Sequence, residues 1–175
     1  MYRVAQLLES LEQLAPLRLA EEWDNVGLLL GDPTAPVSRV LTCLTLTPAV
    51  AEEALQSGCE LIVTHHPILF KAIQRLTTTD TQGRMLWQLI RHNVAGYSAH
   101  TAYDSAARGV NQQLAELFGL QRIQPLIAAA DMPAVGTGRC GELPAATTLG
   151  EFASRVKYLL KAGTRSEEHT SELQS

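Results

Sequence analysis

The sequence predicts an α/β protein with a largely parallel or mixed sheet flanked by helices, which forms the first lobe of a two-lobe fold and the beginning of the second. Two observations predict this class. Short apolar runs typical of buried strands alternate with amphipathic stretches of about ten residues typical of helices, an order that implies βαβ units. Hydrophobic residues make up 46% of the 175 residues and charged residues 18%, which is enough apolar side chain for a core.

The first elements are a helix and two strands. Leucines recur at helical spacing over residues 4–14, until Pro16 ends the pattern. Residues 26–30 form a short apolar run that the turn sequence of residues 31–33 closes. Residues 37–46 are predicted to form a mostly buried strand.

The next elements alternate between helices and strands. Thr47 and Pro48 are typical of the first positions of a helix, and Gly58 is typical of the residue that follows its end. Five further elements are predicted, in the order strand, helix, strand, helix and strand, over residues 61–64, 82–92, 94–98, 110–118 and 122–127.

Three segments follow from this pattern. Residues 1–127 are predicted to be the first lobe, which carries the candidate site. Residues 128–163 are predicted to be a connector rich in Ala, Gly and Pro, followed by the first helix of an incomplete second lobe, which a capping box at Thr148 opens. Residues 164–175 resemble a translated sequencing adaptor and are predicted to be a non-native tail.

Composition and charge exclude several classes of protein. The formal net charge of −4 provides no basic field, so a nucleic-acid partner is not expected. Cys43, Cys59 and Cys140 form no C-x-x-C pair, which predicts reduced thiols. No apolar stretch reaches the roughly 18 to 20 residues of a membrane-spanning helix, and the N-terminus has no apolar signal core. We therefore expect a cytoplasmic protein without a membrane partner.

Metal-ligand residues follow two successive predicted strands. His65 and His66 come directly after residues 61–64, and His100 and Asp104 follow the strand that ends at residue 98. The carboxyl ends of parallel strands meet at one edge of a sheet, where ligands collect. Imidazole with carboxylate suits Zn, Fe, Mn or Co. Because Pro67 keeps His66 extended, the adjacent imidazoles point different ways and suit two metals better than one.

Each of these residues also has a structural interpretation. His65 and His66 can cap backbone groups in a polar turn, and Asp104 can cap a helix. His100 can be a ligand or a residue that orients one, and the sequence favours a structural histidine over a ligand. Residues 23–25 (Trp-Asp-Asn) are predicted to form a turn with an anchored aromatic side chain.

Four motifs, in this order and spacing, resemble those of a known family. They are Trp23-Asp24-Asn25-Val26-Gly27-Leu28, Thr64-His65-His66-Pro67-Ile68, His100-Thr101-x-x-Asp104, and Gly138-Arg139-Cys140-Gly141-Glu142-Leu143. The family is that of the Nif-three-like dinuclear metal proteins, also called GTP cyclohydrolase 1 type 2 homologues. The resemblance covers about residues 1 to 163.

The resemblance implies two related α/β lobes with a two-metal site in the cleft between them, in subunits that assemble into a ring-shaped homohexamer. His65 would bind one metal, and His66 and Asp104 the other. The remaining ligands of the family, a His and a bridging Glu near its C-terminus, lie in a segment absent from this chain, so the chain is expected to be C-terminally truncated. Thr45 stands where the family commonly has an Asp.

Two functions are compatible with these features. The first is a metal-dependent hydrolase with two divalent ions as cofactor and a small, possibly nucleotide-like, substrate. The alternative is a non-enzymatic metal-binding or regulatory assembly protein. No residue is predicted to be catalytic. Because three ligands cannot complete two metal sites, this fragment is expected to bind metal weakly and to be inactive.

Overall fold

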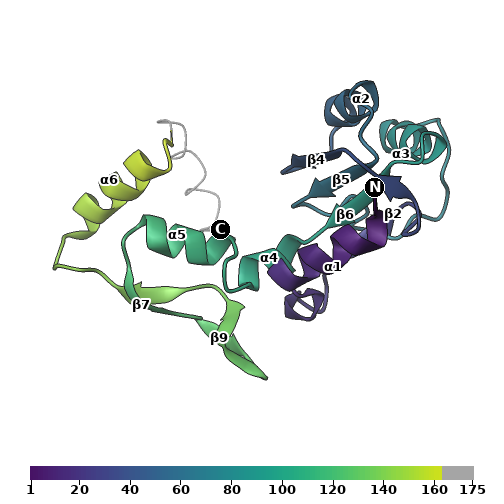
Figure 1. Ribbon diagram of the computed structural model, residues 1–175. Helices are drawn as coiled ribbons and strands as arrows, with labels where there is room; N and C mark the ends of the chain where they lie inside the picture. The colour runs from purple at the N-terminus through teal and green to yellow at the C-terminus, as the bar shows by residue number, and fades with distance from the viewer. Residues whose placement is uncertain (163–175) are drawn as a thin grey trace.

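The computed structural model describes residues 1–162, which form a sheet with helices on both faces and a smaller β-rich part that carries two further helices (Figure 1). The helices are α1 (Val4–Leu14), η1 (Leu17–Leu19, a 3-10 turn), α2 (Pro48–Gln56), α3 (Thr81–Arg91), α4 (His100–Ser105), α5 (Val110–Leu117) and α6 (Leu149–Leu159). The strands are β1 (Tyr2–Arg3), β2 (Gly27–Leu30), β3 (Pro36–Val37), β4 (Val40–Cys43), β5 (Leu61–Thr64), β6 (Ala95–Ser98), β7 (Gln121–Gln124), β8 (Ile127–Ala129), β9 (Met132–Thr137) and β10 (Cys140–Glu142).

The central sheet is mixed, with the strand order β2-β6-β5-β4. Strands β4, β5 and β6 run parallel, and β2 pairs antiparallel with β6. Thr64, the last residue of β5, pairs with Ser98, the last residue of β6, so the two strands end side by side. The predicted α/β class with a largely parallel or mixed sheet is confirmed.

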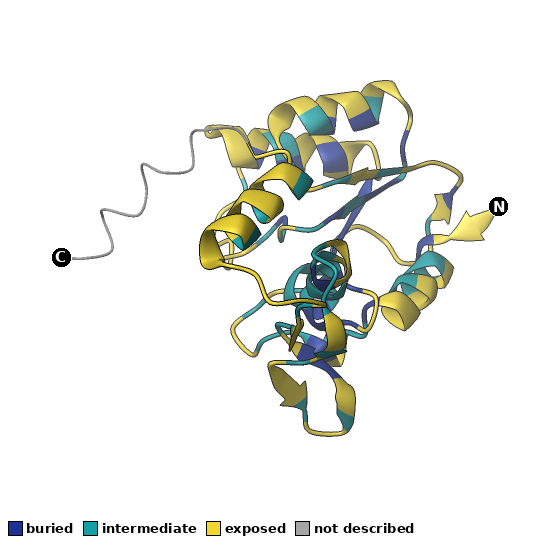
Figure 2. Ribbon diagram, turned by 90° about the vertical axis from the view of Figure 1, so that its left-hand side faces the viewer, coloured by how far each residue is buried: buried dark blue, intermediate teal, exposed yellow. Residues whose placement is uncertain are grey.

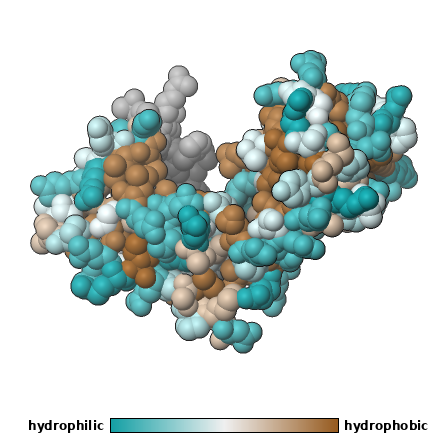
Figure 3. Space-filling view, viewed as in Figure 1, coloured by the Kyte–Doolittle hydropathy of each residue, from teal (hydrophilic) through white to brown (hydrophobic). Residues whose placement is uncertain are grey.

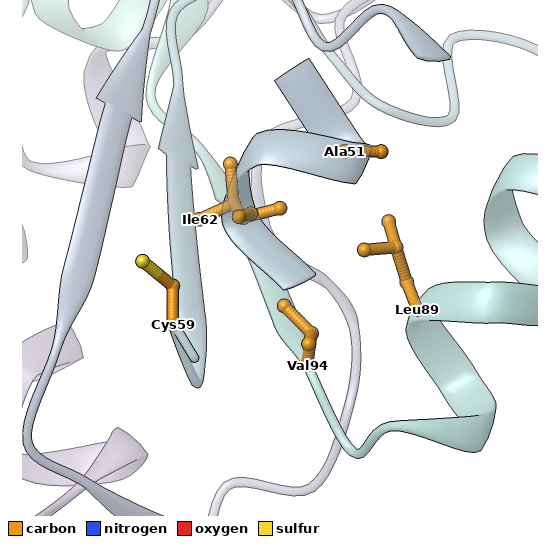
Figure 4. Close-up of a cluster of buried hydrophobic side chains, with 6 residues drawn as sticks. Ala51, Cys59, Ile62, Leu89 and Val94 are labelled. Carbon is orange, nitrogen blue, oxygen red and sulfur yellow. The ribbon is translucent and has the colours of Figure 1, made fainter. Parts of the chain in front are cut away.

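The two faces of the sheet are covered by different helices. Leu61 and Ile62 in β5 are both fully buried and, because side chains alternate along a strand, they belong to different clusters. Ile62 packs with Leu89 and Val94 in the cluster that α2 and α3 cover (Figure 4). Leu61 packs in the cluster that α1 covers. Buried residues accordingly concentrate along the strands and the inner sides of these helices (Figure 2).

The long strand predicted over residues 37–46 is interrupted. Pro36–Val37 pairs with β1, whereas Val40–Cys43 belongs to the central sheet. Between them, the backbone N–H groups of Ser38 and Arg39 donate to the carboxylate of Glu60. These donors are therefore not available to a strand ladder, and one apolar run becomes two short strands. The helix α4 was not predicted.

The segment predicted to be a connector contains strands. β8 and β9 form an antiparallel hairpin, and β10 pairs with β7. Gly136, with φ of 145°, permits the close approach of the two hairpin strands, since a Cβ there would lie 2.1 Å from the carbonyl oxygen of Ile127. The segment boundaries near residues 127 and 163 stay predictions, and the predicted tail lies outside the described residues.

The helix α6 begins as predicted. The hydroxyl of Thr148 accepts from the backbone N–H of Glu151, whose carboxylate accepts from the backbone N–H of Thr148. No residue of α6 is buried, and Leu149 is 84% exposed. Among residues 1–162, no helix has the length and apolar character needed to cross a membrane.

Candidate metal centre

Two parallel strands bring the predicted ligands to one edge of the sheet. His65 and His66 directly follow β5, and His100 opens α4 just after β6. The carbonyl of His65 accepts from the hydroxyl of Ser98 at 2.7 Å and from the backbone N–H of His100 at 3.2 Å. These hydrogen bonds continue the strand pairing beyond the sheet and hold the two loops together.

Three imidazoles meet at this edge. The ring centroids of His65 and His66 are 5.2 Å apart, those of His65 and His100 are also 5.2 Å apart, and those of His66 and His100 are 5.9 Å apart. One ligand nitrogen from each ring lies within 4.8 Å of the others. Because metal–imidazole bonds are about 2.0–2.1 Å long, shifts of about 1 Å would bring these nitrogens around one ion.

A buried carboxylate orients His100. Both oxygens of Asp24 lie within hydrogen-bond distance of His100 Nδ1, at 2.9 and 3.0 Å, and the Asp24 side chain is 0% exposed. Asp24 also accepts from the backbone N–H and the hydroxyl of Thr101. Burial raises the pKa of Asp24, but the hydrogen bonds from Thr101 and His100 outweigh it, so the net pKa is lowered. The ionised carboxylate accepts from Nδ1 and leaves Nε2 of His100 for another partner.

A hydroxyl orients His66. Thr45 Oγ1 lies 2.6 Å from His66 Nδ1. As with His100, the hydrogen bond at Nδ1 leaves Nε2 available to a metal. Two of the three imidazoles are therefore held through Nδ1.

His65 and Asp104 face each other without a hydrogen bond. His65 Nε2 lies 3.8 Å from Asp104 Oδ1, which is beyond hydrogen-bond distance, and their side chains are 21% and 30% exposed. Two ligands of one tetrahedral ion, with bonds of about 2.0–2.2 Å, lie about 3.3–3.6 Å apart, so a small shift of either side chain would be needed for both to bind one metal. Burial and the two neighbouring imidazoles lower the pKa of His65, although Asp104 opposes them. The neutral ring that coordinates metal is thus favoured.

The structure therefore brings His65 and His66 together with His100, and it places Asp104 beside His65 but outside this cluster of three imidazoles, so the predicted ligand set of His65, His66 and Asp104 stays a prediction. His100 is thus part of the cluster, although the sequence favoured a structural histidine over a ligand at this position. The backbone of His100 has φ of 27°, a conformation that non-glycine residues rarely adopt and that occurs preferentially at functional sites.

Asp24 is a site residue that the sequence did not predict. Residues 23–25 were predicted to form a turn with an anchored aromatic side chain, whereas Trp23 is 62% exposed and Asp24 is the buried residue that contacts the site. Pairing of Gly27 in β2 with Ser98 in β6 places the residues before β2 beside the residues after β6, and so brings Asp24 to His100. The local signal was its place in the Trp23-Asp24-Asn25-Val26-Gly27-Leu28 motif that carries the family resemblance.

The chain is similar to known proteins in sequence and in structure. Residues 2–174 match the family model described as Duf34/NIF3 (NGG1p interacting factor 3). The chain belongs to the DUF34/NIF3 family. A NIF3-family relative from Clostridium acetobutylicum, named GTP cyclohydrolase 1 type 2 homolog, is 38% identical over 162 residues. The alignment covers 91% of this chain and 60% of the relative, so the chain spans about three fifths of the length of that curated relative.

Other members of the NIF3 family are similar in sequence or in structure. The bovine NIF3-like protein 1 is 41% identical over 137 residues, which cover 76% of this chain and 36% of the bovine protein. The crystal structure of Staphylococcus aureus protein SA1388 has a TM-score of 0.81 at 28% identity and covers 91% of this chain and 66% of that one. Reduced HcgD from Methanocaldococcus jannaschii has a TM-score of 0.77 at 30% identity and covers 90% of this chain and 60% of that one.

Proposed function

We propose that this chain carries part of a dinuclear divalent-metal centre, with His65, His66 and Asp104 as ligands and His100 as a third imidazole beside them. The observation that supports metal binding is that one ligand nitrogen from each of three imidazoles lies within 4.8 Å of the others, with two of the rings held through Nδ1. The second ion is proposed from the family resemblance. The ligand chemistry supports Zn, Fe, Mn or Co.

For the full-length protein we propose a metal-dependent hydrolase of a small, nucleotide-like substrate. A divalent metal would supply Lewis acidity, polarising the bond to be hydrolysed. The residues of this chain would hold and orient the centre. Asp24 keeps His100 in one tautomer, and Thr45 fixes the ring of His66. The name GTP cyclohydrolase 1 type 2 homolog, carried by relatives at 34–38% identity, supports the choice of nucleotides as first substrates to test.

Metal titration tests the centre directly. The chain is stripped with a chelator and titrated with Zn²⁺ in a calorimeter, and His65→Ala and His66→Ala are compared with the parent. Each substitution removes one ligand, so we expect at least a tenfold loss of affinity. His92→Ala is the matched control, since His92 is an exposed histidine bonded to the carbonyl of Gln88 on α3. Equal Zn²⁺ affinity in the parent and both ligand variants would contradict the proposal.

The second candidate function is a metal-binding or assembly protein without catalysis. The hydrogen bonds around the imidazoles support this function. Asp24 and Thr45 already hold His100 and His66, so neither side chain is free to act as a general acid or base. A full-length relative with metal bound, tested on a panel of nucleotides, separates the two functions. Turnover that disappears in the equivalent of His65→Ala supports the hydrolase, and absence of turnover on every nucleotide supports the binding role.

Self-association is a further part of the proposal. We propose that the full-length protein forms a homohexamer, as the family resemblance implies. Sedimentation of a full-length relative tests it, with a sixfold subunit mass as the expected result and a stable monomer as the contrary one.

A further inference from the structure

Two large aromatic side chains stand exposed beside the histidines. Trp23 is 62% exposed and Phe70 is 52% exposed. Their ring centroids are 6.1 Å apart, and each ring also lies near His100, at 6.2 Å from Trp23 and 6.5 Å from Phe70. We call Trp23 and Phe70 the aromatic wall. It adjoins the candidate metal centre through His100.

The aromatic wall is held by the contacts that build the site. Trp23 directly precedes Asp24, whose buried carboxylate is fixed by His100 and Thr101. Asn25 donates through its side chain to the carbonyl of Leu69, the residue just before Phe70. The loops that carry the two aromatic residues are therefore joined to each other and to α4. Exposed aromatic side chains on such anchored loops are a common feature of binding surfaces.

The ring geometry selects the kind of ligand. Trp23 and Phe70 meet at 62°, and they meet the ring of His100 at 81° and 87° respectively. Edge-to-face rings at these separations are in contact. The space between them is therefore filled, which leaves no cage for an ammonium group. More than half of each of Trp23 and Phe70 is exposed, and a flat aromatic ring can stack on exposed aromatic surface.

We propose that the aromatic wall binds the planar heteroaromatic ring of a ligand whose polar part reaches the histidine cluster. The proposal rests on the proposed metal centre, and it adds a ring-binding subsite with Trp23 as its main surface. The class of ligand is a heteroaromatic ring that carries an anionic or oxygen-rich group, for which purine nucleotides are a suitable probe.

Calorimetric titration of the 175-residue chain with guanosine 5′-monophosphate tests the subsite. Ribose 5-phosphate, which keeps the sugar and phosphate but has no ring, is the control ligand. Since base–aromatic stacking is worth about 1–3 kcal/mol, Trp23→Ala should weaken nucleotide binding by about 5- to 160-fold. Trp23→Phe keeps an aromatic face and should stay within threefold of the parent. Trp87→Ala, which removes the partly exposed tryptophan of α3, should leave the affinity unchanged.

Fluorescence gives a second readout. In a Trp87→Phe background, Trp23 is the only tryptophan of the chain. The nucleotide should quench its emission, and ribose 5-phosphate should not. Equal binding of the two ligands, or nucleotide affinity that does not change in Trp23→Ala, would overturn the proposal.

Two controls separate this inference from the proposed metal centre. Zn²⁺ affinity and the thermal melt of Trp23→Ala should match those of the parent, because Trp23 is not a ligand. Failure of Zn²⁺ binding in the parent, with ring binding intact, would count against the metal centre and leave the subsite standing. If Trp23→Ala abolishes self-association in sedimentation while nucleotide affinity is unchanged, the aromatic wall is a contact with a second copy and the proposal is wrong.

Discussion

At the scale of single residues, the two imidazoles with Nδ1 partners are held by groups of different charge. His100 is paired with the buried carboxylate of Asp24, whereas His66 is paired with the neutral hydroxyl of Thr45. A carboxylate raises the basicity of an imidazole ligand more than a hydroxyl does. The resemblance to the NIF3 family places an Asp at the position of Thr45, so this chain is expected to hold metal less tightly at His66 than relatives with that Asp.

Substitution of Thr45 tests this expectation. Thr45→Val removes the hydroxyl at nearly constant volume and should lower Zn²⁺ affinity about tenfold, the usual order for loss of a group that orients a ligand. Thr45→Asp should raise the affinity. Thr42→Val on β4 is the matched control, because the Thr42 side chain makes no hydrogen bond within residues 1–162. Calorimetry measures all three, and an unchanged affinity in both Thr45 variants would remove Thr45 from the site.

At the scale of elements, α4 depends on contacts from the β-rich part of the chain. The guanidinium of Arg139 donates to the carbonyls of Ser105 and Ala106 at the end of α4 and to the carbonyls of Gly136 and Gly138 near β9. Ser105 and Ala106 are buried, so water cannot easily replace these bonds. Arg139 therefore joins the hairpin to the helix that carries His100 and Asp104.

Arg139→Met should lower the free energy of unfolding by about 2–3 kcal/mol, because buried carbonyls lose charged donors. Urea denaturation measures this loss. The substitution should also increase the rate of amide hydrogen exchange more in α4 than in β5. Arg122→Met is the matched control. Arg122 forms an ion pair with Glu142 in which both side chains are more than half exposed, so its loss should cost less than about 1 kcal/mol. Equal losses of unfolding free energy in the two variants would contradict the role of Arg139 in joining the hairpin to α4.

At the scale of the whole molecule, the described chain leaves an apolar cavity of about 540 Å³ open on the α1 face of the sheet. Leu11, Leu14, Val63 and Tyr97 line it, and it extends to His65. The hydroxyl of Tyr97 is buried without a hydrogen-bond partner among the described residues, and burial raises the pKa of Tyr97 to about 12. Figure 3 shows apolar (brown) surface on the sheet lobe beside the notch that separates it from α5 and α6.

Open apolar surface of this kind binds hydrophobic dyes. We expect the folded chain to enhance the fluorescence of anilinonaphthalene sulfonate at neutral pH. Leu14→Gln, at a half-exposed position of the cavity, should reduce the enhancement, whereas Leu117→Gln on α5 should not. Absence of any enhancement, in a sample with a cooperative melt, would show that the cavity is closed in solution.

Much of this organisation follows from local sequence. The alternation of apolar runs and amphipathic stretches predicted the class, and the helices over 4–14 and 82–92 lie within one residue of α1 and α3. The capping box at Thr148 was likewise sufficient to place the start of α6. His65 and His66 could be placed at a strand end because an apolar strand directly precedes them. These features depend on residues a few positions apart.

Only the tertiary structure decided the surroundings of the histidines. The contact between Asp24 and His100 joins residues 76 positions apart, and it exists because β2 pairs antiparallel with β6. No periodicity in the sequence specifies which strand pairs with which sheet edge. The two neighbouring imidazoles could be predicted as ligands because they are adjacent in the sequence. The groups that orient His100, and the exposed aromatic side chains beside it, could not be predicted, because they come from segments that are distant in the sequence and meet only in the folded chain.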